Sequence, residues 1–78
     1  MPTIAIFDGI KICIYADDHL PPHIHIFFAE HEAAMRISDL GVMAGSLPRT
    51  VLNKALAWAT DNQAQLALRW VQLNEDRS

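Results

Sequence analysis

The chain has 78 residues, of which 51% are hydrophobic and 19% charged, and its formal net charge is −3. This composition excludes a disordered chain, a membrane helix of about 18 uninterrupted apolar residues, and a diffuse basic surface for nucleic acid. Any contact with nucleic acid must therefore be local. The length predicts a single domain over residues 1–78 with a marginal core, which a partner or a second copy would stabilise.

The first three predicted strands lie in the N-terminal part of the chain. Residues 3–7 and 10–15 are rich in β-branched and aromatic side chains and flank Asp8-Gly9, a strong signal for a hairpin. Pro21 and Pro22 lack the amide hydrogen that a strand ladder needs, so residues 17–22 are expected to form a loop. A third strand is predicted at residues 23–28.

A fourth strand is predicted to pair with the third through a turn at residues 30–31. This register places His25 opposite Arg36 and His23 opposite Ser38. It also puts the polar side chains on one face and the apolar ones on the other, whereas a slip by one residue would mix the two faces. The apolar face then carries Ile24, Ile26, Phe28, Ala33, Met35 and Ile37.

The rest of the chain predicts a turn or short edge strand at residues 39–45 and then a helix that opens at residues 46–48. Apolar side chains recur there at steps of three and four, which is one helical stripe. The stripe comprises Leu52, Leu56, Ala59, Gln63, Leu66, Trp70 and Leu73. A helix over residues 48–73 would be about 39 Å long. Thr60 and Gln63 fit a capping box, so a break near residues 60–62 stays open.

The predicted fold class is therefore α+β, with an antiparallel meander of three to four strands followed by a C-terminal helix packed on one face. The only cysteine, Cys13, excludes an internal disulfide, and the residues around Met1 lack the pattern of a signal peptide. We expect a cytoplasmic location and no association with membranes.

The solvent face of this sheet is expected to carry the chemistry. His23 and His25 share it, because alternate residues of a strand point the same way, and Lys11 and Tyr15 join it from the neighbouring strand. Two imidazoles at this spacing could hold a divalent metal, but the nearby Arg36 would repel a cation, which favours an anion such as phosphate. Histidine also suits general acid–base catalysis, while an ordinary solvated face is the third possibility.

These residues give the following candidates. The catalytic candidates are His23, His25 and Arg36, and the substrate-binding candidates are Lys11, Tyr15 and Ser38. No cofactor is expected, with a divalent metal at His23 and His25 as the alternative. Off the main helical stripe, Trp58, Leu68 and Val71 make the helix apolar over more than one face, which predicts a partner interface.

The same segments resemble a known family. They are Met1-Pro2-Thr3-Ile4, Gly9-Ile10, Asp18-His19-x-Pro21-Pro22-His23-x-His25, Leu47-Pro48, Ala57-Trp58-Ala59 and Trp70. The chain resembles DUF4160 proteins of bacteria over nearly its whole length. The resemblance adds His19 to the catalytic candidates and Asp18 to the substrate-binding candidates.

The resemblance also implies a function. DUF4160 proteins commonly occur beside a small DUF2442-type protein, and such pairs are regarded as type II toxin–antitoxin systems in which the DUF4160 member is the toxin. We therefore expect a toxin component whose histidine face binds or acts on an anionic, phosphate-like group, with a small antitoxin-like protein or a second copy as partner. The alternatives are a protein-binding module without enzymatic activity and a histidine-based metal-binding protein.

Overall fold

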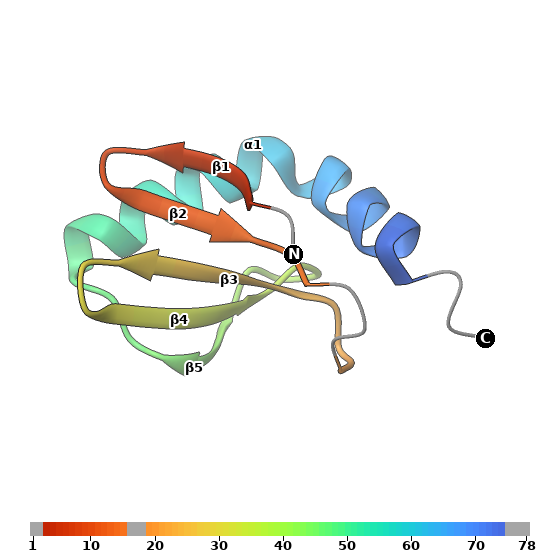
Figure 1. The fold of residues 1–78 in the computed structure, drawn as a ribbon, viewed down its shortest axis with the longest axis horizontal. Helices are drawn as coiled ribbons and strands as arrows, with labels where there is room; N and C mark the ends of the chain where they lie inside the picture. Colours follow the sequence, from red (N-terminus) through yellow and green to blue (C-terminus); the bar gives the residue numbers. More distant parts are fainter. Residues whose placement is uncertain (1–2, 16–18, 75–78) are drawn as a thin grey trace.

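The computed structural model describes residues 3–15 and 19–74, which form one antiparallel sheet and one helix (Figure 1). The elements are β1 (Thr3–Phe7), β2 (Ile10–Cys13), β3 (His23–Phe28), β4 (His31–Arg36), β5 (Val42–Gly45) and α1 (Arg49–Asn74). Each strand pairs with its neighbour in the chain, so the sheet order is β1-β2-β3-β4-β5. This confirms the predicted α+β meander followed by a helix, although the described residues form five strands rather than three to four.

The first hairpin has the predicted turn. Phe7 pairs with Ile10, which leaves Asp8 and Gly9 as the two turn residues. Both have a positive φ, 51° at Asp8 and 76° at Gly9, as a type I′ turn requires. The sequence signal and the backbone geometry agree here because Gly adopts this conformation without steric cost.

The second hairpin differs from the predicted register. His23 pairs with Arg36 and His25 with Ala34, so the prediction of His25 opposite Arg36 and His23 opposite Ser38 is wrong by two residues. The turn falls at Ala29 and Glu30 rather than one residue later, with Ala29 at a φ of 51°. A shift of two residues leaves every side chain on its expected face, because side chains alternate with a period of two.

The fifth strand follows a tight turn at the end of β4. The Arg36 N–H donates to the Gly41 carbonyl at 2.8 Å, and this bond returns the chain alongside β4. β5 then pairs with β4, with Gly45 opposite Ala33. Gly45 has a φ of 75°, and a Cβ at this position would collide with the Glu32 carbonyl oxygen, so the backbone approach requires glycine.

The helix α1 is continuous over 26 residues, so the break near residues 60–62 that the sequence left open does not occur. The Thr60 hydroxyl donates to the Leu56 carbonyl at 2.8 Å, one turn back along the helix, instead of capping a new helix. Gln63 makes no capping contact either, because its Nε2 donates to the carbonyls of Ile37 at 2.7 Å and Ser38 at 3.0 Å. The side chains that suggested a break therefore fasten the helix to itself and to the end of β4.

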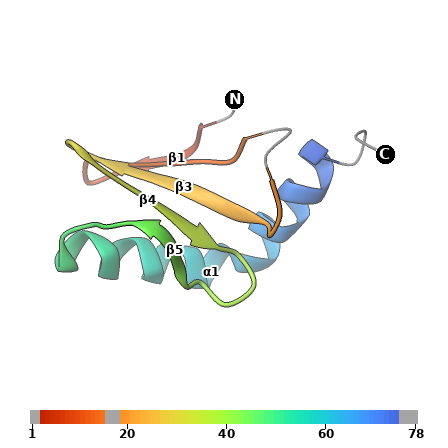
Figure 2. The same cartoon turned by 90° about the horizontal axis from the view of Figure 1, so that it is seen from below.

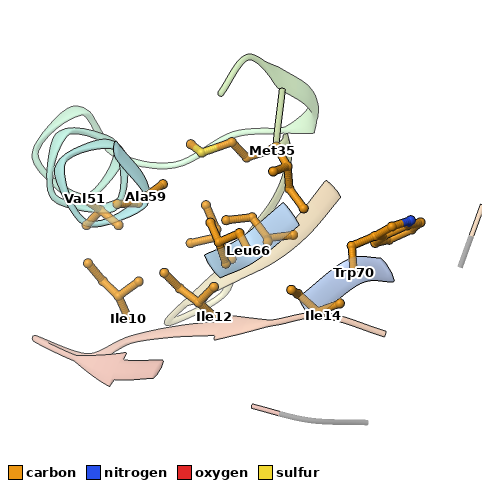
Figure 3. Close-up of a cluster of buried hydrophobic side chains, with 12 residues drawn as sticks. Ile10, Ile12, Ile14, Met35, Val51, Ala59, Leu66 and Trp70 are labelled. Carbon is orange, nitrogen blue, oxygen red and sulfur yellow. The ribbon is translucent and has the colours of Figure 1, made fainter. Parts of the chain in front are cut away.

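The core lies between the sheet and α1, which runs along one side of the sheet (Figure 2). The buried side chains of the helix are Val51, Ala55, Ala59, Leu66 and Trp70. In its first half they are offset by one residue from the predicted stripe, and Leu52 and Leu56 are only half-buried. Figure 3 shows Ile10, Ile12 and Ile14 in the cluster that these helix side chains form.

Among the described residues, no helix or strand covers the other face of the sheet. Because Ile10, Ile12 and Ile24 face the core, the alternate residues of β2 and β3 lie on the opposite face. We call this the histidine face, and in the described strands it carries Lys11, Cys13, His23, His25, Phe27, Glu32, Ala34 and Arg36. No helix among the described residues has an apolar stretch suited to crossing a membrane.

Candidate functional site

A pocket of about 480 Å³ opens on the histidine face. It is lined by His19, His23, His25, Glu32, Ala33, Ala34, Met43, Ala44 and Gly45. The space beside His25 exists because its cross-strand partner is Ala34 and the partner of that residue on β5 is Ala44. Two small side chains in one row across the sheet leave room that larger residues would fill.

Three imidazoles meet at one end of this pocket. The ring of His23 lies 4.9 Å from that of His19 and 4.9 Å from that of His25, measured between ring centroids. His19 comes from the loop before β3, while His23 and His25 come from the strand itself. The fold therefore brings all three predicted histidines together, and the half-buried His31 lies away from them in the β3–β4 hairpin.

His23 is buried, whereas the sequence predicted an exposed strand position. Its residue surface is 1% exposed, because His23 lies at the start of β3, where Trp70 of α1 reaches its ring at 5.5 Å. The Nδ1 atom lies 2.7 Å from the Pro21 carbonyl oxygen. A carbonyl can only accept, so Nδ1 carries the proton and, in the neutral ring, Nε2 carries the lone pair. The loop thus fixes one tautomer of a buried imidazole.

His25 is the more accessible imidazole, with 17% of its side chain exposed. The centroid of the Tyr15 ring lies 4.5 Å from that of His25. The centroid of the Phe27 ring, two residues further along β3, lies 6.5 Å from it. Its Nδ1 is 3.8 Å from a carboxylate oxygen of Glu32. Glu32 was not among the predicted site residues. Because side chains alternate along a strand, the sequence already indicated that Glu32 lies on the histidine face. The structure places it opposite Phe27 there.

Arg36 does not line the pocket, although it shares the face. Its Nη1 donates to both carboxylate oxygens of Asp39, at 2.9 and 2.8 Å. Asp39 also accepts the Gly41 N–H at 2.9 Å. The Gly41 N–H and, second, the Arg36 guanidinium hold the pKa of the Asp39 carboxyl below its usual value. The guanidinium is thus used to close the turn after β4.

The predicted substrate-binding residues have separate positions. Lys11 places its ammonium nitrogen 5.8 Å from the centroid of the Phe27 ring, and Tyr15 packs on His25. Ser38 is exposed in the turn after β4, and its carbonyl accepts from Gln63, so it does not line the pocket. Asp18 lies outside the described residues. Tyr15 therefore contacts a pocket histidine and Lys11 lies over the neighbouring Phe27, but neither lines the pocket, and Ser38 lies away from it.

The histidine motif, its pocket and the helix behind it lie within one family match. Residues 9–74 match the family model described as Domain of unknown function (DUF4160). The chain belongs to the DUF4160 family. No match to it was found among curated proteins or among solved structures. The family assignment predicted from the sequence is confirmed, while the pairing with an antitoxin stays a prediction.

Within this DUF4160 chain, the three residues predicted as a partner interface lie at or near a second hollow. A groove of about 480 Å³ runs between β1 and α1. Its lining comprises Ile4, Ala5, Trp58, Asn62, Gln65, Leu66, Leu68, Arg69 and Gln72. Trp58 stacks on Phe7 of β1 at 6.1 Å, and the exposed Leu68 and Val71 lie on the outer part of the helix. Trp58 and Leu68 therefore share one groove, whereas the exposed Val71 is not part of its lining.

The metal alternative concerns His23 and His25, and it stays a prediction. Among the described residues of this DUF4160 chain, no group of three or more His, Cys, Asp or Glu side chains is arranged to hold a metal ion. The contact between Nδ1 of His23 and a backbone carbonyl is of the kind that orients metal-binding histidines.

Proposed function

We propose that this DUF4160 protein is the toxin component of a type II toxin–antitoxin pair, and that the histidine pocket is the site of its toxicity. The observation that supports this proposal is the convergence of His19, His23 and His25 on one pocket. Clustered imidazoles supply both a general base and a general acid, the two groups that acid–base catalysis at a phosphodiester uses. The family resemblance supplies the toxin role, and the pocket supplies a place for its chemistry.

The proposed roles follow from burial and tautomer. His23 has its proton fixed on Nδ1 by Pro21, so Nε2 is the atom suited to act as a base. His25 is more accessible and lies near the Glu32 carboxylate, which stabilises a protonated imidazole, so it suits the general acid. His19 is exposed on the loop and would contact the substrate. Arg36 leaves the catalytic set, because Asp39 binds its guanidinium.

The anionic group would then be recognised by the imidazoles and Lys11 rather than by Arg36. Without Arg36, the site carries less positive charge than the sequence suggested, and the carboxylate of Glu32 lowers its net charge further. A site of this kind favours a phosphodiester with one charge over a phosphate monoester with two. The small antitoxin-like partner is proposed to occupy the groove at Trp58 and Leu68, away from the pocket.

Growth inhibition in a bacterial host tests the proposal. The chain would be expressed from an inducible promoter as wild type, as His25→Ala and as His31→Ala, each with and without the neighbouring gene. His31 is the matched control, because it is a histidine in the β3–β4 hairpin that does not line the pocket. We expect the wild type and His31→Ala to stop growth, the neighbouring gene to restore it, and His25→Ala to be harmless.

Three outcomes would contradict the proposal in different ways. Full growth inhibition by a folded His25→Ala variant would remove the pocket from the mechanism. Harmless expression of the wild type would remove the toxin role and favour a binding module. One zinc ion retained per purified chain in native mass spectrometry, and lost in His25→Ala, would favour the metal-binding alternative instead.

A further inference from the structure

A row of aromatic side chains borders the pocket, and the proposed acid–base chemistry does not account for all of it. The rings of His25 and Phe27 project from alternate positions of β3, with centroids 6.5 Å apart and planes within 16° of parallel. Tyr15 extends the row at 4.5 Å from His25. The Lys11 ammonium lies over Phe27 at 5.8 Å. Phe27 and Tyr15 are only half-buried, so part of this row meets solvent.

The two rings offer neighbouring flat surfaces to a planar guest. Their centroids are 6.5 Å apart, close to the repeat of about 6.7 Å between residues i and i+2 of a strand. A planar ring that packs on either of them lies at the usual contact distance of about 3.5 Å. The backbone that carries both rings lies in the central strand of the sheet.

The placement of these rings on the sheet identifies the class of guest. An open antiparallel sheet with a helix behind it and aromatic side chains on its central strand is a recurring platform for single-stranded RNA, whose bases stack on the rings. β3 is the central strand here and α1 lies on the opposite face (Figures 1 and 2). We propose that the histidine face binds single-stranded RNA, with one base stacked against His25 and Phe27 and the adjacent phosphate at the imidazoles.

This inference rests on the proposed function, because the RNA phosphodiester is the anionic substrate of that same pocket. RNA is favoured over DNA as the substrate, because its 2′-hydroxyl serves as the nucleophile and the protein then needs to supply only a base and an acid. The base removes the 2′-hydroxyl proton, the 2′-oxygen bonds to phosphorus, and the 5′-oxygen leaves with a proton from the acid. The products are a 2′,3′-cyclic phosphate and a 5′-hydroxyl, so no further reactant is required.

The charge of the chain sets how the RNA would bind. With a net charge of −3 there is no long-range attraction, and Lys11 is the lysine next to the aromatic row. Stacking must therefore supply much of the affinity, and few counterions are released. We expect a shallow salt dependence, with a slope of log K against log salt of about −1, as for one or two phosphate contacts on a single strand.

Fluorescence anisotropy with a labelled single-stranded RNA oligonucleotide tests this inference. The competitors are the matching RNA duplex and the all-deoxy strand, and the proteins are the wild type, Phe27→Leu and Phe7→Leu. Phe7→Leu makes the same chemical change on β1, on the helix-covered face. We expect Phe27→Leu to weaken binding about tenfold, the usual effect of losing one base–aromatic stack, and Phe7→Leu to leave it unchanged.

The outcomes of the binding and growth experiments, taken together, separate this inference from the proposed function. Equal affinity for duplex and single strand, or no effect of Phe27→Leu, would overturn the inference even if His25 is needed for toxicity. Binding that depends on Phe27, together with toxicity that does not depend on His25, would support the inference and overturn the proposed function. The all-deoxy strand should bind without being cut, and its cleavage would overturn the assignment to RNA.

Discussion

His23 combines packing and chemistry in one side chain. It touches the rings of His19, His25 and Trp70 and is 1% exposed, so it belongs to the core as much as to the pocket. Its hydrogen bond to Pro21 satisfies a polar atom whose burial without a partner would cost about 1–3 kcal/mol. An imidazole held in this way is preorganised, because neither its rotamer nor its tautomer needs to change during a reaction.

We expect the two strand histidines to differ in their effect on stability. His23→Ala should lower the free energy of unfolding by about 2–3 kcal/mol, because it opens a cavity against Trp70 and leaves the Pro21 carbonyl without its donor. His25→Ala should cost about 1 kcal/mol or less, because His25 is partly exposed. Urea denaturation measures both. Equal losses in the two variants would show that the contact with Trp70 contributes little.

The sequence predicted which residues form the site better than it predicted their surroundings. The alternation of His23 and His25 is a local pattern, and it placed both on one face correctly. The burial of His23 depends on Trp70, which comes from a distant part of the chain and carries no local signal. The position of Arg36 outside the pocket has a related reason, because Asp39 could be recognised as its partner only once the turn after β4 was known.

The turn between β4 and β5 depends on a single carboxylate. Asp39 accepts from the backbone of Gly41 and from the side chain of Arg36, and these two donors hold its pKa below the usual value of 3.8. A group whose pKa is lower in the folded state stabilises that state above its unfolded pKa. The stabilisation is lost as the pH falls through the folded pKa.

Asp39→Asn should therefore make the protein easier to unfold near neutral pH. The difference from the wild type should shrink below about pH 4 and vanish once the carboxyl is protonated in both states. The effect is expected to be small, since the Asp39 side chain is exposed. Urea unfolding of both proteins across this range of pH is the measurement. A difference that stays constant down to acid pH would mean that the charge of Asp39 is irrelevant.

Turn residues explain which elements were predicted well. The Asp8-Gly9 turn was identified because both residue types favour a positive φ, whereas Ala29 adopts the same conformation without any sequence signal. The error of two residues in the β3–β4 register follows from that position alone. The sequence left a helix break open because Thr60 can bond to a carbonyl one turn back, an option that the capping pattern does not distinguish.

Two hollows formed by the described residues lie at different places on the molecule, one over β3, β4 and β5 and the other between β1 and α1. The pocket holds the histidines, and the groove between β1 and α1 holds apolar side chains with Arg69 as the charged residue of its lining. β1 is an edge strand without charged residues, which is the kind of edge that another chain can pair with. The separation allows a partner to bind without entering the pocket.

If the proposed function holds, we expect Leu68→Glu to weaken binding of the proposed antitoxin-like partner. Leu68 is 58% exposed in the groove lining, so the change should leave the fold intact while it puts a carboxylate into an apolar contact. Affinity for the neighbouring gene product should fall about tenfold or more, as at other central apolar contacts. Calorimetry measures the affinity, and growth inhibition should persist even when the partner is co-expressed.

The control for this variant is Ala67→Glu, which adds the same charge at an exposed helix position outside the groove lining. It should bind the partner as the wild type does. Normal binding by Leu68→Glu, or equal loss in both variants, would place the interface elsewhere on the molecule.

The order of the elements determines when the site can form during synthesis. Every strand pairs with its neighbour in the chain, so the sheet requires only short loops to close, but its apolar face stays open until α1 is made. Trp70, which completes the wall around His23, is supplied near the end of that helix. A nascent chain that stops before Trp70 would thus lack both a closed core and a complete pocket. In ribosome-bound chains of increasing length that carry Trp58→Phe, the emission of Trp70 would report that step, and the proposed toxicity would begin only after almost the whole domain has left the ribosome.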